Sequence, residues 1–155
     1  YWSSNYDKFH LAPCEDFAEQ IWKDRTFVYS NCAPGDSRLN RGEWKALENQ
    51  IRLNVDKITT AYVFTAPIFI LDEGICIKTV GVHCVPVPTH FAKAMLTVRD
   101  DKPSMVAWIA PNMEPPADAV YEDWRTSVDD VEFKAGVDLY AWLPDDVERK
   151  LEAGK

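Results

Sequence analysis

The chain has 155 residues, of which 46% are apolar and 12% aromatic, so we expect one folded domain with a core of ordinary density. No apolar run approaches the ~20 residues of a membrane-spanning helix, which excludes a transmembrane segment in this sequence. The net charge of −8 excludes a uniformly basic nucleic-acid-binding protein. Residues 1–57 have 8 basic and 9 acidic side chains, whereas residues 58–155 have 9 and 16, so any phosphate-binding site must be local and near the N-terminal third.

Periodicity and turn residues predict helices and strands in mixed order. A short helix over 14–22 precedes a strand over 26–34, which runs into a loop closed by Pro34-Gly35-Asp36, and a long helix over 39–57 follows. Ser127 and Gly136 are typical of the cap and the end of a helix. The later predicted elements are strands at 61–71, 89–100 and 104–112, a hairpin within 74–88, and helices at 127–138 and 144–155. Because no βαβ alternation occurs, the order favours the α+β class.

The long predicted helix has two polar residues on or beside its apolar face. At 100° per residue, Asn40 lies in the middle of the apolar stripe and Glu48 lies on its edge. The apolar members of the stripe are Trp44, Leu47, Ile51 and Val55. A buried amide or carboxylate without a partner costs about 1–3 kcal/mol. Two interpretations remain open at this point: an N-terminal cap by Asn40 with an ion pair between Glu48 and Arg52, or the face of an active site.

Several stretches resemble the DNA/RNA non-specific endonuclease family, the endonuclease G-like group with a ββα-metal finger. SSNYDKFHLAP is similar to the family's S-G-Y-D-R-G-H-L-A-P, and FVYSNCAP with LNRGEWKALENQIR is similar to its next conserved part. The spacings of Asn31, Asn40, Glu48 and Arg52 agree with the family. VPVPTHFAKAML, IAPN and SVDDVEFKAGVDLYAWLP resemble its later strands and its closing helix. The resemblance covers nearly the whole chain.

The resemblance implies the site residues and their roles. His10 would be the general base that activates water on a phosphodiester, and Asn40 would be the direct protein ligand of Mg²⁺, for which Mn²⁺ can substitute. Glu48 would hold a metal-bound water. The residues implied as catalytic are His10, Asn31, Glu48, Arg52 and Lys8; Asn31 would complete a polar wall near His10, and Arg52 and Lys8 would bring positive charge to the phosphate.

The resemblance also implies the architecture and the activity. The fold would be an α+β domain over residues 1–155, with an antiparallel sheet core, or the C-terminal part of a longer family domain. The family's N-terminal strands are absent from the sequence, so we expect an exposed sheet edge that is filled by a second copy or by a partner chain. The activity would be Mg²⁺-dependent hydrolysis of DNA and RNA, in a mitochondrial or secreted protein. The alternative is a catalytically weak or inactive nuclease fold that serves as a structural or binding subunit.

Two dipeptides depart from the family pattern. Lys8-Phe9 stands where the family has Arg-Gly, and Pro34-Gly35 stands where it has Pro-Gln. With an ordinary backbone at Phe9, we expect its ring near His10, where it either stacks on a substrate base or covers the cleft; a ring in the core is the alternative.

The four cysteines are Cys14, Cys32, Cys76 and Cys84, and none of them forms a C-x-x-C pair. A hairpin turning near residues 79–81 would allow a Cys76–Cys84 disulfide, which the sequence permits without requiring. A zinc site from these two cysteines with His83 and His90 fits no familiar ligand spacing and is disfavoured.

Overall fold

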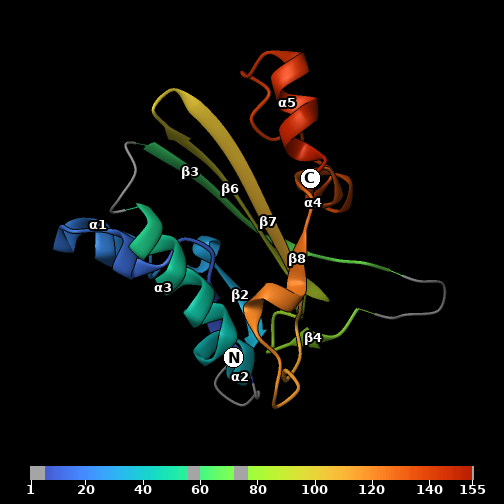
Figure 1. Ribbon diagram of the computed structural model, residues 1–155. Coiled ribbons are helices and arrows are strands. Elements are labelled where there is room, and N and C mark those ends of the chain that lie inside the picture. The colour runs from blue at the N-terminus through green and yellow to red at the C-terminus, as the bar shows by residue number, and fades with distance from the viewer. Residues whose placement is uncertain (1–5, 56–59, 72–76, 155) are drawn as a thin grey trace.

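A four-stranded antiparallel sheet is the centre of the fold, in the order β3–β6–β7–β8 (Figure 1). The structure is a computed structural model that describes residues 6–55, 60–71 and 77–154. The strands of the sheet are β3 (Thr60–Ile68), β6 (His90–Arg99), β7 (Lys102–Pro111) and β8 (Arg125–Thr126). Helices together with an antiparallel sheet confirm the predicted α+β class.

Each face of the sheet is covered by a different set of elements (Figure 1). The helices are α1 (Gln20–Arg25), α2 (Ser37–Arg41), α3 (Glu43–Val55), α4 (Val128–Ala135) and α5 (Asp145–Glu152). One core cluster joins Trp44, Leu47 and Ile51 of α3 to Phe91 and Met95 of β6. The other cluster lies on the opposite face, between the sheet and the segment that includes α4. The sheet therefore separates the α3 side of the molecule from the α4 and α5 side.

The strand β6 is buried on both faces, which explains its apolar sequence. Residues 91–96 are all buried; Phe91 and Met95 belong to the cluster under α3, whereas Ala92, Ala94 and Leu96 belong to the other cluster. Strand alternation places Lys93 on the same face as Phe91 and Met95. A lysine therefore lies in the middle of the buried layer.

A second, two-stranded sheet leads into the helices α2 and α3. β1 (Tyr6–His10) pairs antiparallel with β2 (Cys32–Asp36), and His10 is opposite Cys32. The Asp36 carboxylate accepts hydrogen bonds from the backbone N–H groups of Arg38 and Leu39, and this cap starts α2 directly after β2. The result is the ββα arrangement that the resemblance predicts.

The N-terminal elements differ in detail from their sequence-based prediction. The helix predicted over 14–22 is a 3₁₀ turn at Cys14–Asp16 followed by α1. The strand predicted over 26–34 begins only at Cys32, after a 3₁₀ turn at Tyr29–Asn31. The helix predicted over 39–57 is two helices, because Gly42 has a non-helical backbone, with φ −100° and ψ −113°.

The later elements follow the prediction more closely. β3, β6 and β7 lie within one to three residues of the predicted strands, and a short hairpin of β4 (Thr79–Val80) and β5 (Val85–Pro86) stands in the predicted region. The Ser127 hydroxyl accepts from the backbone N–H of Asp130, and Gly136 ends α4 with φ +66°, as predicted. A third 3₁₀ turn lies at Tyr121–Trp124. No helix in the described ranges has the length and apolar character needed to cross a membrane.

Candidate active site

A cleft beside the ββα arrangement brings together three of the predicted site residues. His10 is the last residue of β1, Asn40 lies in α2 and Glu48 lies in α3, and all three line the same cavity of about 410 Å³. The other lining residues are Pro13, Cys14, Glu15, Arg41 and Lys45. His10 shares the site with residues 30 and 38 positions later in the sequence, because β2 pairs with β1 and leads directly into the helices.

His10 has the electrostatic environment of a neutral imidazole. The residue is half-buried, and its Nε2 atom is buried without a hydrogen-bond partner in the described part of the chain. Burial lowers the pKa of His10 from its usual 6.5, and the positive charge of Lys8 lowers it further. The edge of the ring meets Phe27 at 4.9 Å between centroids. At neutral pH the ring is therefore unprotonated, which is the state that a general base requires.

A hydrogen bond to Asp7 orients the amide of Asn40. Asn40 Nδ2 donates to Asp7 Oδ2 at 3.1 Å, and Arg41 donates to both carboxylate oxygens of Asp7, at 2.8 and 2.7 Å. The hydrogen bonds from Arg41 are the main cause of the lowered pKa of Asp7, so this carboxylate is ionised at neutral pH. Because the amide nitrogen is used by Asp7, the carbonyl oxygen remains as the ligand atom. An amide oxygen that shares a cleft with a carboxylate suits a hard cation such as Mg²⁺.

Glu48 is held at the back of the cleft by a buried charge pair. Its Oε1 accepts a hydrogen bond from Trp44 Nε1 at 3.1 Å and lies 3.8 Å from Lys93 Nζ. Lys93 is only 2% exposed, donates to Thr65 Oγ1 at 3.0 Å, and lies over the Trp44 ring at 5.2 Å. Burial raises the pKa of Glu48 and lowers the pKa of Lys93, and each charge partly offsets the effect of burial on the other.

Three predicted site residues do not line this cleft. The Asn31 amide accepts from the backbone N–H of Ala12 at 3.0 Å and donates to the carbonyls of Ala12 and Thr26, at 2.9 and 3.0 Å. It therefore fixes the chain just after His10. Arg52 donates to Asp16 at 2.7 Å and to Glu15 at 3.0 Å.

Lys8 is exposed on β1, with its Nζ 5.0 Å from the centroid of the Tyr29 ring. Strand alternation places Lys8 on the same side of β1 as His10.

The expectation that Phe9 stacks on substrate or covers the cleft is wrong. Phe9 is fully buried, and its ring stacks on Phe91 with centroids 3.6 Å apart and an interplanar angle of 4°. Strand alternation turns Phe9 to the opposite side of β1 from His10. The ring is thus part of the core beneath α3, the alternative that the sequence left open.

Sequence reasoning missed Asp7 and Lys93. Asp7 is inside the quoted motif, and a strand over residues 6–10 would have placed it on the same face as Phe9, toward the helices. The signal for Lys93 is a single charged residue in the apolar run FAKAML, because a lysine flanked by buried residues requires a partner.

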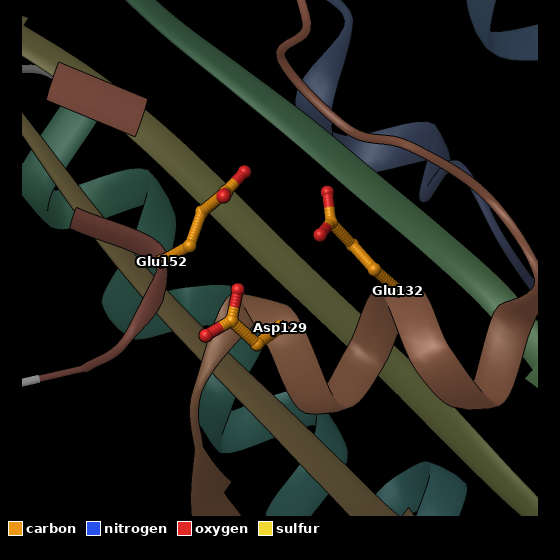
Figure 2. Close-up of side chains that lie close together, drawn as sticks. All are labelled: Asp129, Glu132 and Glu152. Atoms are coloured by element: carbon orange, nitrogen blue, oxygen red, sulfur yellow. The ribbon is translucent and has the colours of Figure 1, made fainter. Parts of the chain in front are cut away.

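Within the residues that the structure describes, a single group of three or more carboxylate, histidine or cysteine side chains lies close enough together to share a metal ion, and it lies outside the cleft. It consists of Asp129 and Glu132 on α4 and Glu152 at the end of α5 (Figure 2). The disfavoured zinc site is not formed by its described members His83, Cys84 and His90, and Cys76 lies outside the described residues.

The proposed Cys76–Cys84 disulfide cannot be placed, because Cys76 lies outside the described residues. Cys84 is an exposed free cysteine in the turn between β4 and β5, and Cys14 and Cys32 are also free.

Comparisons with known proteins agree on one family. The protein-family model described as DNA/RNA non-specific endonuclease matches residues 1–146 of this chain. Endonuclease G, mitochondrial, of Caenorhabditis elegans is 33% identical over 92% of this chain and 49% of its own length. Nuclease C1 of Cunninghamella echinulata var. echinulata is 34% identical over 90% of this chain and 59% of its own length, and a nuclease of Serratia marcescens is 29% identical over 95% and 55%. The chain thus spans about half the length of these relatives.

A solved structure has the same fold. The crystal structure of a complex of EndoG with EndoGI, described as showing the mechanism of EndoG inhibition, aligns with a TM-score of 0.88 and 29% identity. The alignment covers 100% of this chain and 66% of the matched chain.

Proposed function

The chain belongs to the DNA/RNA non-specific endonuclease family, and on this basis we propose that it hydrolyses phosphodiester bonds of DNA and RNA at the cleft of His10, Asn40 and Glu48. The observation that carries the proposal is the shared cleft, where an unprotonated histidine faces the same space as an oriented amide and a buried carboxylate. These are the groups that proton transfer and cation binding require.

In this proposal, His10 acts as the general base. A water molecule attacks phosphorus, its oxygen forms the new P–O bond, and its proton passes to the unprotonated imidazole. The bond from phosphorus to the leaving oxygen breaks. Asn31 holds the backbone that follows His10, so we assign it a positioning role through its hydrogen bonds to Ala12.

Asn40 directly, and Glu48 through water, would hold a divalent cation, for which Mg²⁺ is our proposal. When bound, the cation stabilises the negative charge that builds on the phosphate and the leaving oxygen. Asp7 keeps the Asn40 carbonyl available by occupying the amide nitrogen, and Lys93 balances the buried charge of Glu48.

The cationic side chains differ in their availability to phosphate. Lys45 lines the cleft, so we assign it the first phosphate contact. Arg41 also lines the cleft, but two hydrogen bonds hold its guanidinium on Asp7. Lys8 extends from β1 beside His10 and is our candidate for a further contact. Arg52 meets phosphate only if its hydrogen bonds to Glu15 and Asp16 give way.

A partner at the sheet edge and the location of the protein are two further predictions. β3 is an edge strand that pairs only with β6 in the described part of the chain, and Tyr62 and Val63 on it are exposed. A second copy or a partner chain that pairs with this edge stays a prediction. Several relatives carry the word mitochondrial in their names, and a mitochondrial or secreted location for this protein is likewise a prediction.

The test is cleavage of supercoiled plasmid and of RNA in MgCl₂, with and without excess chelator. We expect nicking that chelator abolishes, and we expect Asn40→Ala to lose it while keeping its circular dichroism spectrum. Asn54→Ala, an exposed asparagine on α3, is the matched control and should cleave normally.

Normal cleavage by Asn40→Ala would refute the assignment of this residue. Binding of nucleic acid without cleavage, by the unmodified chain in Mg²⁺, would support the alternative of a nuclease fold that serves as a binding subunit.

A further inference from the structure

Three carboxylates converge on the face of the sheet opposite α3. Asp129 and Glu132 are three residues apart on α4, so their side chains project from the same side of the helix, and Glu152 reaches them from the end of α5. One ligand oxygen from each residue lies within 4.8 Å of the other two. Figure 2 shows the three side chains pointing toward a common space.

The buried member of this acidic cluster has an unpartnered oxygen. Glu152 is 6% exposed, and its Oε1 is buried with no hydrogen-bond partner among the described residues. No lysine or arginine in the described ranges forms an ion pair with Asp129, Glu132 or Glu152. A buried carboxylate without a hydrogen bond or a counter-charge is costly, so a group of this kind requires either a proton or a cation.

The second acidic side chain of the cluster is already oriented. Glu132 Oε1 accepts a hydrogen bond from the backbone N–H of Leu139 at 2.6 Å. This bond fixes the direction of the carboxylate and leaves its other oxygen as a ligand. Asp129 is exposed, which gives an ion a path from solvent and room for water ligands.

We propose that Asp129, Glu132 and Glu152 form a calcium-binding site that joins α4 to α5. Two ligands of one ion are at most twice the metal–oxygen distance apart, which is about 5 Å for Ca²⁺ and about 4.2 Å for Mg²⁺. The ligand oxygens lie within 4.8 Å of one another, which meets this limit for Ca²⁺, and the flexible coordination of Ca²⁺ accepts an irregular set of carboxylates. The site is separate from the cleft and does not depend on the proposed hydrolysis.

Calorimetric titration with CaCl₂ tests the site in a chain that carries Asn40→Ala, which removes the proposed ligand in the cleft. We expect saturable binding with one ion per chain, and we expect Glu152→Gln to weaken it at least tenfold. The glutamine keeps the shape of the side chain and removes its buried charge, so the variant should fold. Asp146→Asn, an exposed residue on the same helix, changes the net charge equally and should bind calcium normally.

A second measurement keeps the test valid if Asn40→Ala does not fold. In the chain with Asn40 intact, Glu152→Gln should reduce the rise in melting temperature that CaCl₂ produces, because only the cleft can still bind an ion, and Asp146→Asn should retain the full rise. Absence of saturable calcium binding would overturn the proposal, as would equal loss in both variants. A third outcome would also overturn the proposal. If calcium has no effect on the chain with Glu152, and Glu152→Gln is the more stable of the two chains without calcium, the buried carboxylate is protonated and binds no cation.

Discussion

Lys93 and Glu48 form the buried charge pair on which the back of the cleft depends. Removal of one partner of a buried pair leaves an uncompensated charge and costs about 3–5 kcal/mol. We therefore expect Lys93→Met to lower the free energy of unfolding by this amount, measured by urea denaturation at pH 7. The double variant Lys93→Met with Glu48→Gln should recover part of the lost free energy of unfolding. If the loss in the double variant equals the sum of the two single losses, the two residues do not interact.

The pH dependence of cleavage reports the state of His10. Its pKa is lowered by burial and by Lys8, and only the unprotonated ring can act as a base. Protonation therefore inactivates the protein as pH falls through a pKa below 6.5, so the acidic limb of kcat/KM should have its midpoint below this value. Lys8→Met removes one cause of the lowering and should move the midpoint upward. A midpoint above 6.5 would contradict the burial of the ring.

At the level of the residue, the family motif carried most of the information about the site. The shared cleft of His10, Asn40 and Glu48 was expected from the resemblance, and the structure places all three on it. Periodicity placed Asn40 in the middle of the apolar stripe of one long helix, which is wrong: the chain breaks at Gly42, and in α2 the buried residue is Leu39, whereas Asn40 is half-buried. Asp7 and Lys93 required the three-dimensional arrangement, because periodicity describes only local neighbours. Their partners are distant in the sequence: Asn40 is 33 residues from Asp7, and Thr65 is 28 residues from Lys93.

Among the elements, β1 and β2 each carry one residue that departs from the family pattern, Phe9 and Gly35, and the packing of the two strands explains both departures. A Cβ atom at Gly35 would lie 2.4 Å from Phe9 Cδ2 and 2.7 Å from Phe9 Cβ. The Phe9 ring thus occupies the space that a side chain at position 35 would need. The family has glycine where this chain has Phe9, and glutamine where this chain has Gly35. The larger residue at position 9 and the smaller residue at position 35 therefore compensate for each other in size.

Gly35→Gln tests this compensation. Overpacking costs about 1–3 kcal/mol, and we expect the free energy of unfolding to fall within that range. Phe9→Gly alone should also be destabilising, because it removes a ring from the core. The double variant should be more stable than the two separate losses predict, by about 0.5–3 kcal/mol. Strict additivity of the two losses would show that the pair does not share space.

Element boundaries were predicted where the local capping residues were recognised. α4 was predicted with its cap and its end because Ser127 and Gly136 act locally. The cap by Asp36 is equally local but was assigned to a loop, so the start of α2 at Ser37 was missed. The non-helical backbone of Gly42, which divides the predicted long helix into α2 and α3, was also missed.

At the scale of the whole molecule, the sheet separates two electrostatic environments. The cleft lies on the α3 side, where Arg41 and Lys45 accompany Glu15 and Glu48, whereas the acidic cluster and the acidic first turn of α5 lie on the opposite side. This arrangement agrees with the near-neutral balance of residues 1–57 and the excess of acid in residues 58–155. A strongly negative chain can thus present one face to nucleic acid without a uniformly basic surface.

The central claim is that the imidazole of His10 takes the proton from water during phosphodiester hydrolysis. The most direct measurement is the single-turnover cleavage rate of His10→Ala in saturating Mg²⁺, compared with the unmodified chain under the same conditions. Loss of a general base lowers the rate by about 10²–10⁴-fold, and we predict a loss of this size in a variant that still folds and binds the substrate. A folded His10→Ala chain that cleaves at a near-normal rate would contradict the account.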